Sequence, residues 1–257
     1  MQGIQRQVAI LDAISDAPES GVSITNLCLA SGLPKSTVHR LLESLREYGI
    51  AVQEVDSKKW RLGPRVAFWA GKYLEGPASV VPVRPFVGRL SQETQFFTYL
   101  TILDHDDLVC VAVERPECKA HFFVQLGSRV PVLSTAAAKA LLAYQPEDVV
   151  RPLVVRATTE NPSTRFETVT VESYLRELAE VRSCGYAKCM EELEAGVSAL
   201  GAPIVNAYGR SVASLSVVAP TTALVAEWEQ TIEKLHHVAE ETSMMLGKEP
   251  ENRVVRW

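Results

Sequence analysis

The segment GLPKSTVHRLL, residues 32–42, decides the fold of the N-terminal part of this chain. Gly32 suits a tight turn, because glycine enters positive φ without steric cost. Pro34 then suits a helix start, where a missing N–H leaves no hydrogen bond unmade. From there apolar residues recur with the period of a helix. They are Val38, Leu41, Leu42 and Leu45. The pattern predicts a tight turn followed by an amphipathic helix.

The opposite face of this helix is polar, and its residue types suit the major groove of DNA. Hydroxyls and helical N–H groups bind phosphates, and Arg or Lys side chains can reach guanine edges. The candidate DNA contacts on this helix are Lys35, Ser36, Thr37, His39, Arg40 and Arg46. Taken alone, the helix is also compatible with a solvated amphipathic helix of an ordinary helical domain.

The flanking segments have the order of a winged helix-turn-helix. Helical spacing predicts one helix over 4–15, and Ser23 can cap a second helix over 24–31. After the recognition helix, residues 50–55 and 60–62 predict a hairpin with a polar tip. Its cations, which can lie along phosphates, are Lys58, Lys59 and Arg61. A two-lysine tip is commonly a solvated turn, but this order of elements favours DNA binding.

The composition is that of an ordinary globular protein rather than a strongly basic one. The chain has 257 residues, is 47% hydrophobic and carries a formal charge of −5 at pH 7. The formal charge is +1 over residues 1–75 and −6 over residues 76–257. DNA affinity therefore has to come from the local placement of cations. No signal peptide or long apolar run is visible, which predicts a soluble cytoplasmic protein with no membrane partner.

The cysteines and histidines indicate neither a disulfide framework nor a metal site. The chain has five cysteines, an odd number without a C-x-x-C pair, which favours reduced thiols. The five histidines do not cluster with them at ligand spacing. Common catalytic and nucleotide-binding motifs are also missing. We expect no metal, no cofactor and no enzymatic activity.

A short linker helix is predicted after the wing, from Pro64 to the breaker Gly76-Pro77. It carries more apolar surface than a short helix needs, from Val66, Ala67, Phe68, Trp69, Ala70 and Leu74. This surface can fold back on its own domain or pack on the same helix of a second subunit. We favour the second arrangement, because a helix-turn-helix usually reads DNA as a dimer.

Helical and strand patterns interleave through the rest of the chain, which predicts an α+β domain with an antiparallel sheet flanked by helices. The predicted helices are 83–95, 134–144, 147–157, 171–184 and 223–246. The predicted strands are 96–103, 108–114, 120–126, 198–206 and 211–218. Small-molecule sensor domains have this layout, although a fold alone does not prove sensing.

Three places in this domain can hold a ligand. Ser134 or Thr135 can cap a helix that opens on small residues, whose unpaired N–H groups suit an anion. A plain capped helix with alanines for close packing is an equal alternative. Alternation over 213–218 places Ser216 on a hydroxyl-bearing face, which can line a cavity or bond neighbouring backbone. The carboxylate pair within 189–192, just after a short predicted strand, is in the usual case surface charge.

Four segments of the chain together form a familiar pattern. They are LPKSTVHRLL at 33–42, WRLG at 60–63, AKALLA at 138–143, and the stretch from GY at 185–186 through EELEAGV at 191–197 to API at 202–204. Each is moderately specific, and all four in this order and spacing are very specific. In them the chain resembles the IclR-type family of bacterial transcriptional regulators over nearly its whole length.

The resemblance implies three parts: a winged helix-turn-helix over 1–63, a linker helix over 64–77, and a GAF-like domain for effector binding and oligomerisation over 78–257. It also implies homodimers that pair into tetramers on a palindromic double-stranded DNA operator. Family members repress or activate, often beside catabolic genes, in response to small carboxylic acids. We expect a regulator of this kind, with repression favoured over activation.

The resemblance also implies an effector pocket. The ligand carboxylate would sit on the backbone N–H groups of Ala136 and Ala137, behind the capping residue Thr135. The other implied pocket residues are Cys189, Val197, Ala199, Ser216 and Val218, with apolar walls from Phe122, Phe123 and Val130. Cys189 stands where the family commonly has an acid, so the pocket has few polar groups. Such a pocket favours an acid with one carboxylate and an apolar or aromatic body.

The sequence is also compatible with two functions of other classes. The chain can be an enzyme whose N-terminal helices only oligomerise it, but the missing catalytic motifs argue against that interpretation. It can also be an architectural DNA binder without a ligand. The acidic region 76–257, with its candidate anion site, argues against that second alternative.

Overall fold

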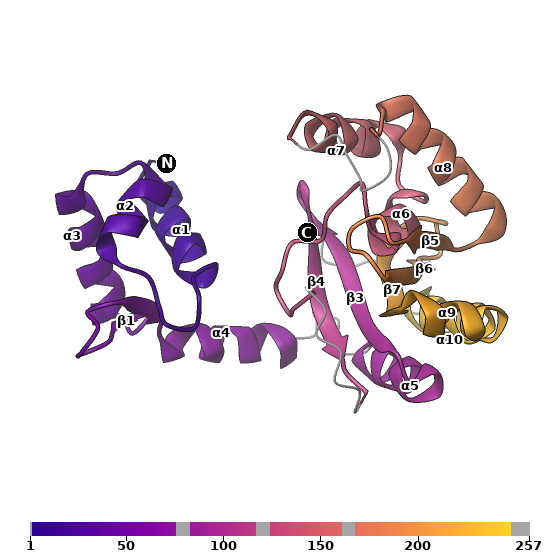
Figure 1. The fold of residues 1–257 in the computed structure, drawn as a ribbon, viewed down its shortest axis with the longest axis horizontal. Coiled ribbons are helices and arrows are strands. Elements are labelled where there is room, and N and C mark those ends of the chain that lie inside the picture. Colours follow the sequence, from indigo (N-terminus) through magenta and orange to yellow (C-terminus); the bar gives the residue numbers. More distant parts are fainter. Residues whose placement is uncertain (1, 76–82, 117–123, 161–167, 248–257) are drawn as a thin grey trace. The chain divides into compact units, whose positions relative to one another are not determined.

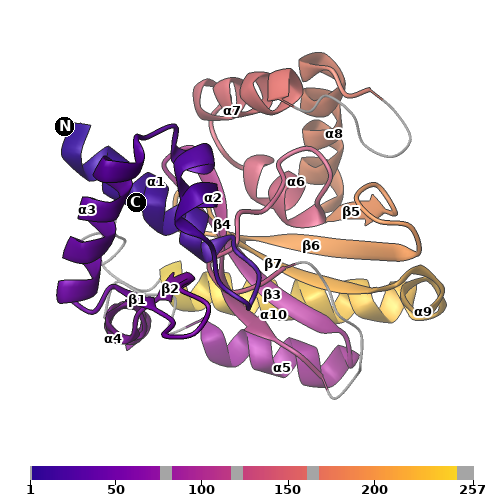
Figure 2. The same ribbon diagram turned by 60° about the vertical axis from the view of Figure 1, so that its left-hand side comes forward.

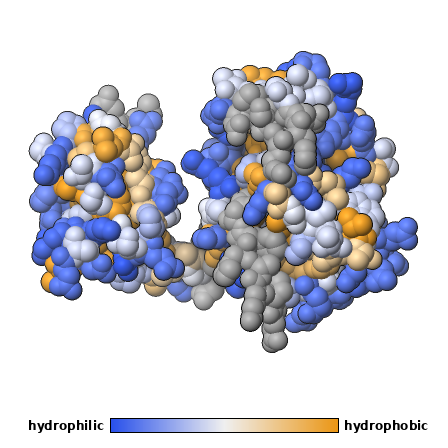
Figure 3. Space-filling model, in the orientation of Figure 1, coloured by the Kyte–Doolittle hydropathy of each residue, from blue (hydrophilic) through white to orange (hydrophobic). Residues whose placement is uncertain are grey.

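The computed structural model describes residues 2–75, 83–116, 124–160 and 168–247 (Figure 1). The chain divides into two compact units, Met1–Ser79 and Val80–Trp257. Each unit has a hydrophobic core of its own. On the face that Figure 3 shows, each unit has many hydrophilic residues with apolar patches between them. Among the described helices, none combines the length and the apolar character needed to cross a membrane.

The first unit consists of helices and one short hairpin. In chain order its elements are α1 (Gln2–Ser15), α2 (Ile24–Ser31), α3 (Lys35–Glu47), β1 (Ala51–Gln53), β2 (Trp60–Leu62) and α4 (Pro64–Glu75). The two strands pair antiparallel. Three helices followed by a hairpin confirm the predicted winged helix-turn-helix.

Local side-chain chemistry sets the turn between α2 and α3. The Ser23 hydroxyl accepts a hydrogen bond from the Asn26 N–H at 3.2 Å and caps α2. Gly32 ends α2 with φ of +65°, the left-handed conformation that favours glycine. Pro34 then stands immediately before α3. The turn residues of the quoted segment therefore do what their types predict.

The apolar stripe of α3 forms the centre of the first core. Val38, Leu42 and Leu45 are buried, and Trp60 of the wing packs into the same cluster. An antiparallel bridge between Val22 and Trp60 ties the wing to the segment ahead of α2. This packing fixes the orientation of α3, so that its polar face is turned away from the core.

The second unit combines helices with one sheet. Its elements are α5 (Arg84–Thr94), β3 (Phe97–Asp104), β4 (Asp107–Glu114), α6 (Ala136–Leu142), α7 (Glu147–Glu160), α8 (Val171–Cys184), β5 (Ala187–Met190), β6 (Val197–Val205), β7 (Ser211–Pro220), α9 (Thr221–Ala226) and α10 (Trp228–Gly247). The strands pair antiparallel in the order β4-β3-β7-β6-β5.

Helices cover both faces of this sheet (Figures 1 and 2). α6, α7 and α8 lie on one face, and α5, α9 and α10 lie on the other. Side chains alternate along each strand, so Tyr99 and Val218 belong to the core under α6, whereas Leu100 and Val217 belong to the core under α10. The predicted α+β class with a helix-flanked antiparallel sheet is confirmed.

Three details differ from the sequence predictions. The single helix predicted over 223–246 is two helices, because Glu227 leaves helical geometry with φ of −116° and ψ of 25°. Both helices bury apolar residues in the same core, so their combined periodicity hides the break. Cys189 lies within β5 rather than after it. Of the strand predicted over 120–126, residues 120–123 lie outside the described part, and 124–126 are not in a strand.

Candidate functional site

The polar face of α3 presents basic side chains that are accessible for binding. Lys35, His39 and Arg40 are exposed, and no hydrogen bond or ion pair of these side chains occurs among the described residues. Ser36 is exposed beside them, and Thr37 is half-buried in the first turn of the helix. Exposed cations and hydroxyls at the N-terminal end of a helix can contact both phosphates and base edges.

The remaining predicted cations of this unit differ in their surroundings. Arg46 pairs with Glu43 on the same helix, and Arg61 Nη2 lies 3.3 Å from Glu54 Oε1. Lys58 is exposed at the wing tip, where its φ is +56°. Glu43 and Glu54 thus partly neutralise Arg46 and Arg61. The Arg40 side chain has no such acidic partner among the described residues.

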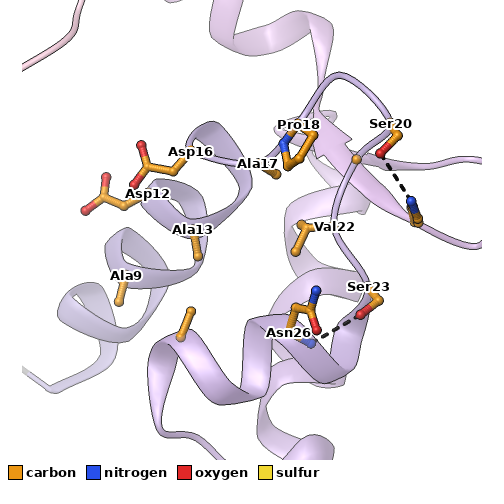
Figure 4. A pocket seen from close by; sticks show the side chains of 13 residues that line it. Ala9, Asp12, Ala13, Asp16, Ala17, Pro18, Ser20, Val22, Ser23 and Asn26 are labelled. Carbon is orange, nitrogen blue, oxygen red and sulfur yellow. Dashed lines mark hydrogen bonds between the residues drawn. The ribbon is translucent and has the colours of Figure 1, made fainter. Parts of the chain in front are cut away.

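Lys59 lies at the edge of a groove of about 660 Å³ between α1, α2 and the wing (Figure 4). Its Nζ donates to Ser20 Oγ at 3.2 Å. Alanines line much of the groove, and Asp12 and Asp16 add two carboxylates to it. Carboxylates repel phosphates, so the groove itself does not favour DNA.

A small pocket in the second unit lies where the resemblance implies an effector. Its lining residues come from β3, β5, β6, β7 and the segments beside them. They are Tyr99, Ser134, Thr135, Cys189, Leu193, Glu194, Val197, Ser198, Ala199 and Val218. Five of them were predicted from the sequence: Thr135, Cys189, Val197, Ala199 and Val218. The structure therefore brings together five predicted residues that are up to 83 positions apart, from Thr135 to Val218.

The other predicted residues surround the pocket without lining it or lie outside the description. Ala136 and Ala137 are fully buried in α6 directly after Thr135. Ser216 is buried on β7 as the cross-strand neighbour of Tyr99. Val130 is part of the core under α6. Phe122 and Phe123 lie outside the described residues.

Sequence reasoning missed half of the lining: Tyr99, Ser134, Leu193, Glu194 and Ser198. Tyr99 lies on a predicted strand, and its inward direction follows only from the register with β7. Leu193 and Glu194 lie in a loop without any periodic pattern. Ser134 belongs to the segment that the sequence indicates as a candidate anion site, but of its two possible helix caps Thr135 performs that role.

The pocket offers neutral donors on its α6 side. Thr135 Oγ1 donates to Pro131 O at 2.7 Å and accepts from the Ala138 N–H at 3.3 Å, which caps the helix. For the N–H groups of Ala136 and Ala137, no acceptor is found in the described part of the chain. The Cys189 thiol donates to Ser134 O at 3.1 Å. Among the described residues, no lysine or arginine lines the pocket.

Burial keeps the phenol of Tyr99 and the thiol of Cys189 protonated. The pKa of Tyr99 is raised well above its ordinary value by desolvation, with Cys110 and Cys189 adding to the rise. Desolvation, followed by the Glu192 carboxylate, raises the pKa of Cys189 to about 11. The phenol and the thiol are therefore neutral at physiological pH, and both can donate hydrogen bonds.

A buried lysine lies next to the pocket but does not line it. Lys139 of α6 is 1% exposed, and its Nζ lies 2.6 Å from Glu177 Oε1 and 2.7 Å from Glu192 Oε2. Burial alone lowers the pKa of Lys139, but the two carboxylates outweigh it and raise that pKa above its ordinary value. The lysine charge is matched by these carboxylates, so it is not available to a ligand.

Known proteins match both units of the chain. Residues 3–55 match the IclR helix-turn-helix domain, and residues 78–244 match the C-terminal domain of the bacterial transcriptional regulator IclR. The chain belongs to the IclR family of transcriptional regulators.

Individual relatives extend over nearly the whole chain. The HTH-type transcriptional regulator XynR of Escherichia coli is 30% identical over 251 residues, which are 96% of this chain and 98% of XynR. An IclR regulator structure from Alicyclobacillus acidocaldarius has a TM-score of 0.83 at 22% identity and covers 96% of this chain and 99% of its own. An IclR homologue from Microbacterium hydrocarbonoxydans, complexed with 4-hydroxybenzoate, has a TM-score of 0.76 at 25% identity. The match covers 95% of this chain and 98% of the homologue.

These matches determine the class of the protein. It is a DNA-binding transcriptional regulator with an effector-binding domain, and not an enzyme. The winged helix-turn-helix of the first unit and the pocket-bearing sheet domain of the second are the structural counterparts of these two functions.

Proposed function

We propose that this protein binds a palindromic operator as a homodimer or a dimer of dimers, and that a monocarboxylic acid with an apolar or aromatic body modulates the binding. Residues 1–63 would bind DNA, and residues 78–257 would bind the effector and oligomerise. Residues 64–77 would form the linker helix between these two domains. Control of a catabolic operon, with repression favoured over activation, completes the proposal. The observation that carries it is the pocket with neutral donors and apolar walls.

Exposed side chains of α3 and the wing support the DNA-binding part. Lys35, Ser36, Thr37, His39 and Arg40 would enter the major groove, because they lie on the face of α3 that is turned away from the core. The candidate phosphate contacts are Arg46, Lys58, Lys59 and Arg61. We assign Arg40 the largest share of specificity, since its guanidinium has no protein partner in the described structure and can bind guanine bidentately.

The exposed surface of α4 supports a dimer. Phe68 is 63% exposed and Trp69 is 47% exposed, and none of the helix's described side chains is buried. The guanidinium of Arg65 lies over the Trp69 ring at 5.7 Å. Leaving two large aromatic side chains in water forfeits burial free energy. Packing of α4 on the same helix of a second subunit would recover it and would double the DNA contacts.

The chemistry of the pocket supports the choice of effector. The free N–H groups of Ala136 and Ala137 can hold one carboxylate, and Tyr99 can donate to a second polar atom. Apolar walls come from Val197, Ala199 and Val218. Among the described lining residues, Glu194 is the one with a carboxyl group, and this group disfavours a second carboxylate on the ligand. The 4-hydroxybenzoate complex of the Microbacterium relative supports an aromatic monocarboxylate.

A footprint on the DNA that flanks this protein's own gene tests the proposal. The footprint is repeated with 4-hydroxybenzoate, benzoate, pyruvate and glyoxylate. We expect a two-fold symmetric footprint that an aromatic acid weakens or alters and that Arg40→Ala weakens. Tight binding of glyoxylate by calorimetry, without binding of the larger acids, would refute the assigned effector class. Failure to bind flanking DNA at low salt would remove the roles given to Lys35 and Arg40.

A further inference from the structure

The loop between β5 and β6, residues 191–196, forms one wall of the effector pocket. Leu193 and Glu194 line the pocket from this loop. The loop is compact, because Glu191 N donates to Val197 O at 3.1 Å and Val197 N donates to Glu194 O at 3.3 Å. Glu191 has φ of +58°, a conformation that a residue other than glycine adopts at a cost. Contacts outside the loop are therefore needed to hold it in place.

Lys139 supplies such a contact. Its Nζ donates to both carboxylate oxygens of Glu192, at 2.8 Å and 2.7 Å. The same Nζ lies 2.6 Å from Glu177 Oε1 of α8. One buried cation thus binds two carboxylates from different elements, and only Glu192 belongs to the loop. The Glu192 side chain is 20% exposed, so water screens this pair only in part.

The pocket is too small for an organic acid with the loop in this position. The space open to the centre of a water molecule is about 20 Å³, which is room for about one water. The strand walls are held by the ladders of β3, β6 and β7, and α6 is buried along its whole length. Residues 191–196 belong to no strand and have no ladder partner in the described sheet. At the end of the loop, Thr221 N donates to Gly196 O at 2.8 Å. Displacement of residues 191–195 therefore leaves the strand ladders intact.

We propose that Lys139 is a positioning residue for effector binding, which holds the loop 191–196 over the pocket through Glu192 and thereby controls access to it. This inference rests on the proposed effector site. Glu177 has the other role: it ties the same lysine to α8 and does not hold the loop. If the ion pairs were merely structural, the loss of either carboxylate would have similar effects.

Glu192→Gln and Glu177→Gln form a matched pair of variants for the test. Each replaces one of the two carboxylates that pair with Lys139 by a neutral amide of the same shape. Amide hydrogen exchange of the full-length protein measures opening of the loop. We expect Glu192→Gln to speed exchange at residues 191–196 about tenfold, while Glu177→Gln leaves it within about twofold of the wild type. Lys139→Met frees both carboxylates and should open the loop like Glu192→Gln.

The Cys189 thiol gives a second readout that needs no effector. It lines the pocket, and its modification is followed by mass spectrometry with iodoacetamide and with the bulkier N-phenylmaleimide. A change in the thiolate fraction of Cys189 alters both modification rates by the same factor. The rate with N-phenylmaleimide divided by the rate with iodoacetamide therefore reports on the opening of the loop. We expect Glu192→Gln to raise this ratio and Glu177→Gln to leave it unchanged.

Equal effects of the two glutamine variants on loop exchange and on the reagent ratio would overturn the proposal, as would no effect of either. Absence of acid binding to the wild type by calorimetry, combined with a selective effect of Glu192→Gln, would overturn the effector assignment and leave the role of Lys139 in holding the loop intact. The two failures are thus distinguishable.

Discussion

A Cβ atom at Gly201 would lie 2.7 Å from the carbonyl oxygen of Ala136. In the described part of the chain, the N–H groups of Ala136 and Ala137 have no acceptor. The close approach of β6 fixes the position of this first turn of α6. It also explains why α6 opens on three alanines, all of them fully buried. The two interpretations of these alanines, close packing and an anion site, are therefore compatible.

Gly201→Ala should destabilise the second unit by about 1–3 kcal/mol, because the added methyl group meets backbone atoms that cannot rotate away. It should also weaken effector binding, since α6 has to shift. Urea unfolding followed by calorimetry measures both effects. Gly88→Ala is the control: its Cβ meets nothing closer than 4.0 Å, and alanine is the better helix former. Equal stability of the two variants would contradict the packing argument.

Arg40→Ala should weaken operator binding by ~1–3 kcal/mol and relax sequence preference, if Arg40 reads a base edge. Arg46→Ala, on the same helix, should cost less, because Glu43 already pairs with Arg46. Gel shifts with operator and random DNA at fixed salt compare the two. An equal loss on both DNAs for Arg40→Ala would identify it as a phosphate contact only.

Phe68→Ala should raise the dimer dissociation constant by about tenfold or more, because large aromatic side chains dominate interface free energies. Sedimentation equilibrium of the full-length protein without DNA is the measurement. Leu29→Ala serves as the control, since Leu29 is an even more exposed apolar residue of the same unit, at 78%. A dimer that survives Phe68→Ala and Trp69→Ala unchanged would place the interface elsewhere.

The stability of the protein should fall at alkaline pH, partly through Cys189. Burial raises the pKa of this thiol to about 11 in the folded state, from an ordinary value of 9.0. The folded state then holds its proton where the unfolded state has lost it, so stability is complete below pH 9 and falls as the pH rises towards 11. The loss should reach about 2 kcal/mol at pH 11.

Urea unfolding of wild type and Cys189→Ala from pH 7 to pH 11, under reducing conditions, isolates this contribution. The difference in unfolding free energy between the two proteins should shrink as the pH rises, because the variant lacks the thiol. Cys110, whose pKa burial raises to about 12, contributes with the same sign in both proteins. Parallel curves would mean that Cys189 does not ionise with unfolding in this range.

The lining of the proposed effector pocket was only half predictable from sequence. Thr135, Cys189, Val197, Ala199 and Val218 were implied by the resemblance to the family. The positions of Tyr99, Leu193 and Glu194 depend on the strand register and on the path of the loop 191–196. Neither of these produces a periodic pattern in the sequence. The same limit applies to Glu227, where one residue interrupts a helical pattern that continues in the same core.

The sequence by itself determined the winged helix-turn-helix and the order of its elements, because periodicity, the Ser23 cap and the Gly32 turn depend on neighbours within a few residues. Only the tertiary structure decided which cations are free and which are paired. The Lys59–Ser20 bond spans 39 residues and the Lys139–Glu192 pair spans 53. Contacts of that separation form when whole elements pack together, so no local pattern encodes them.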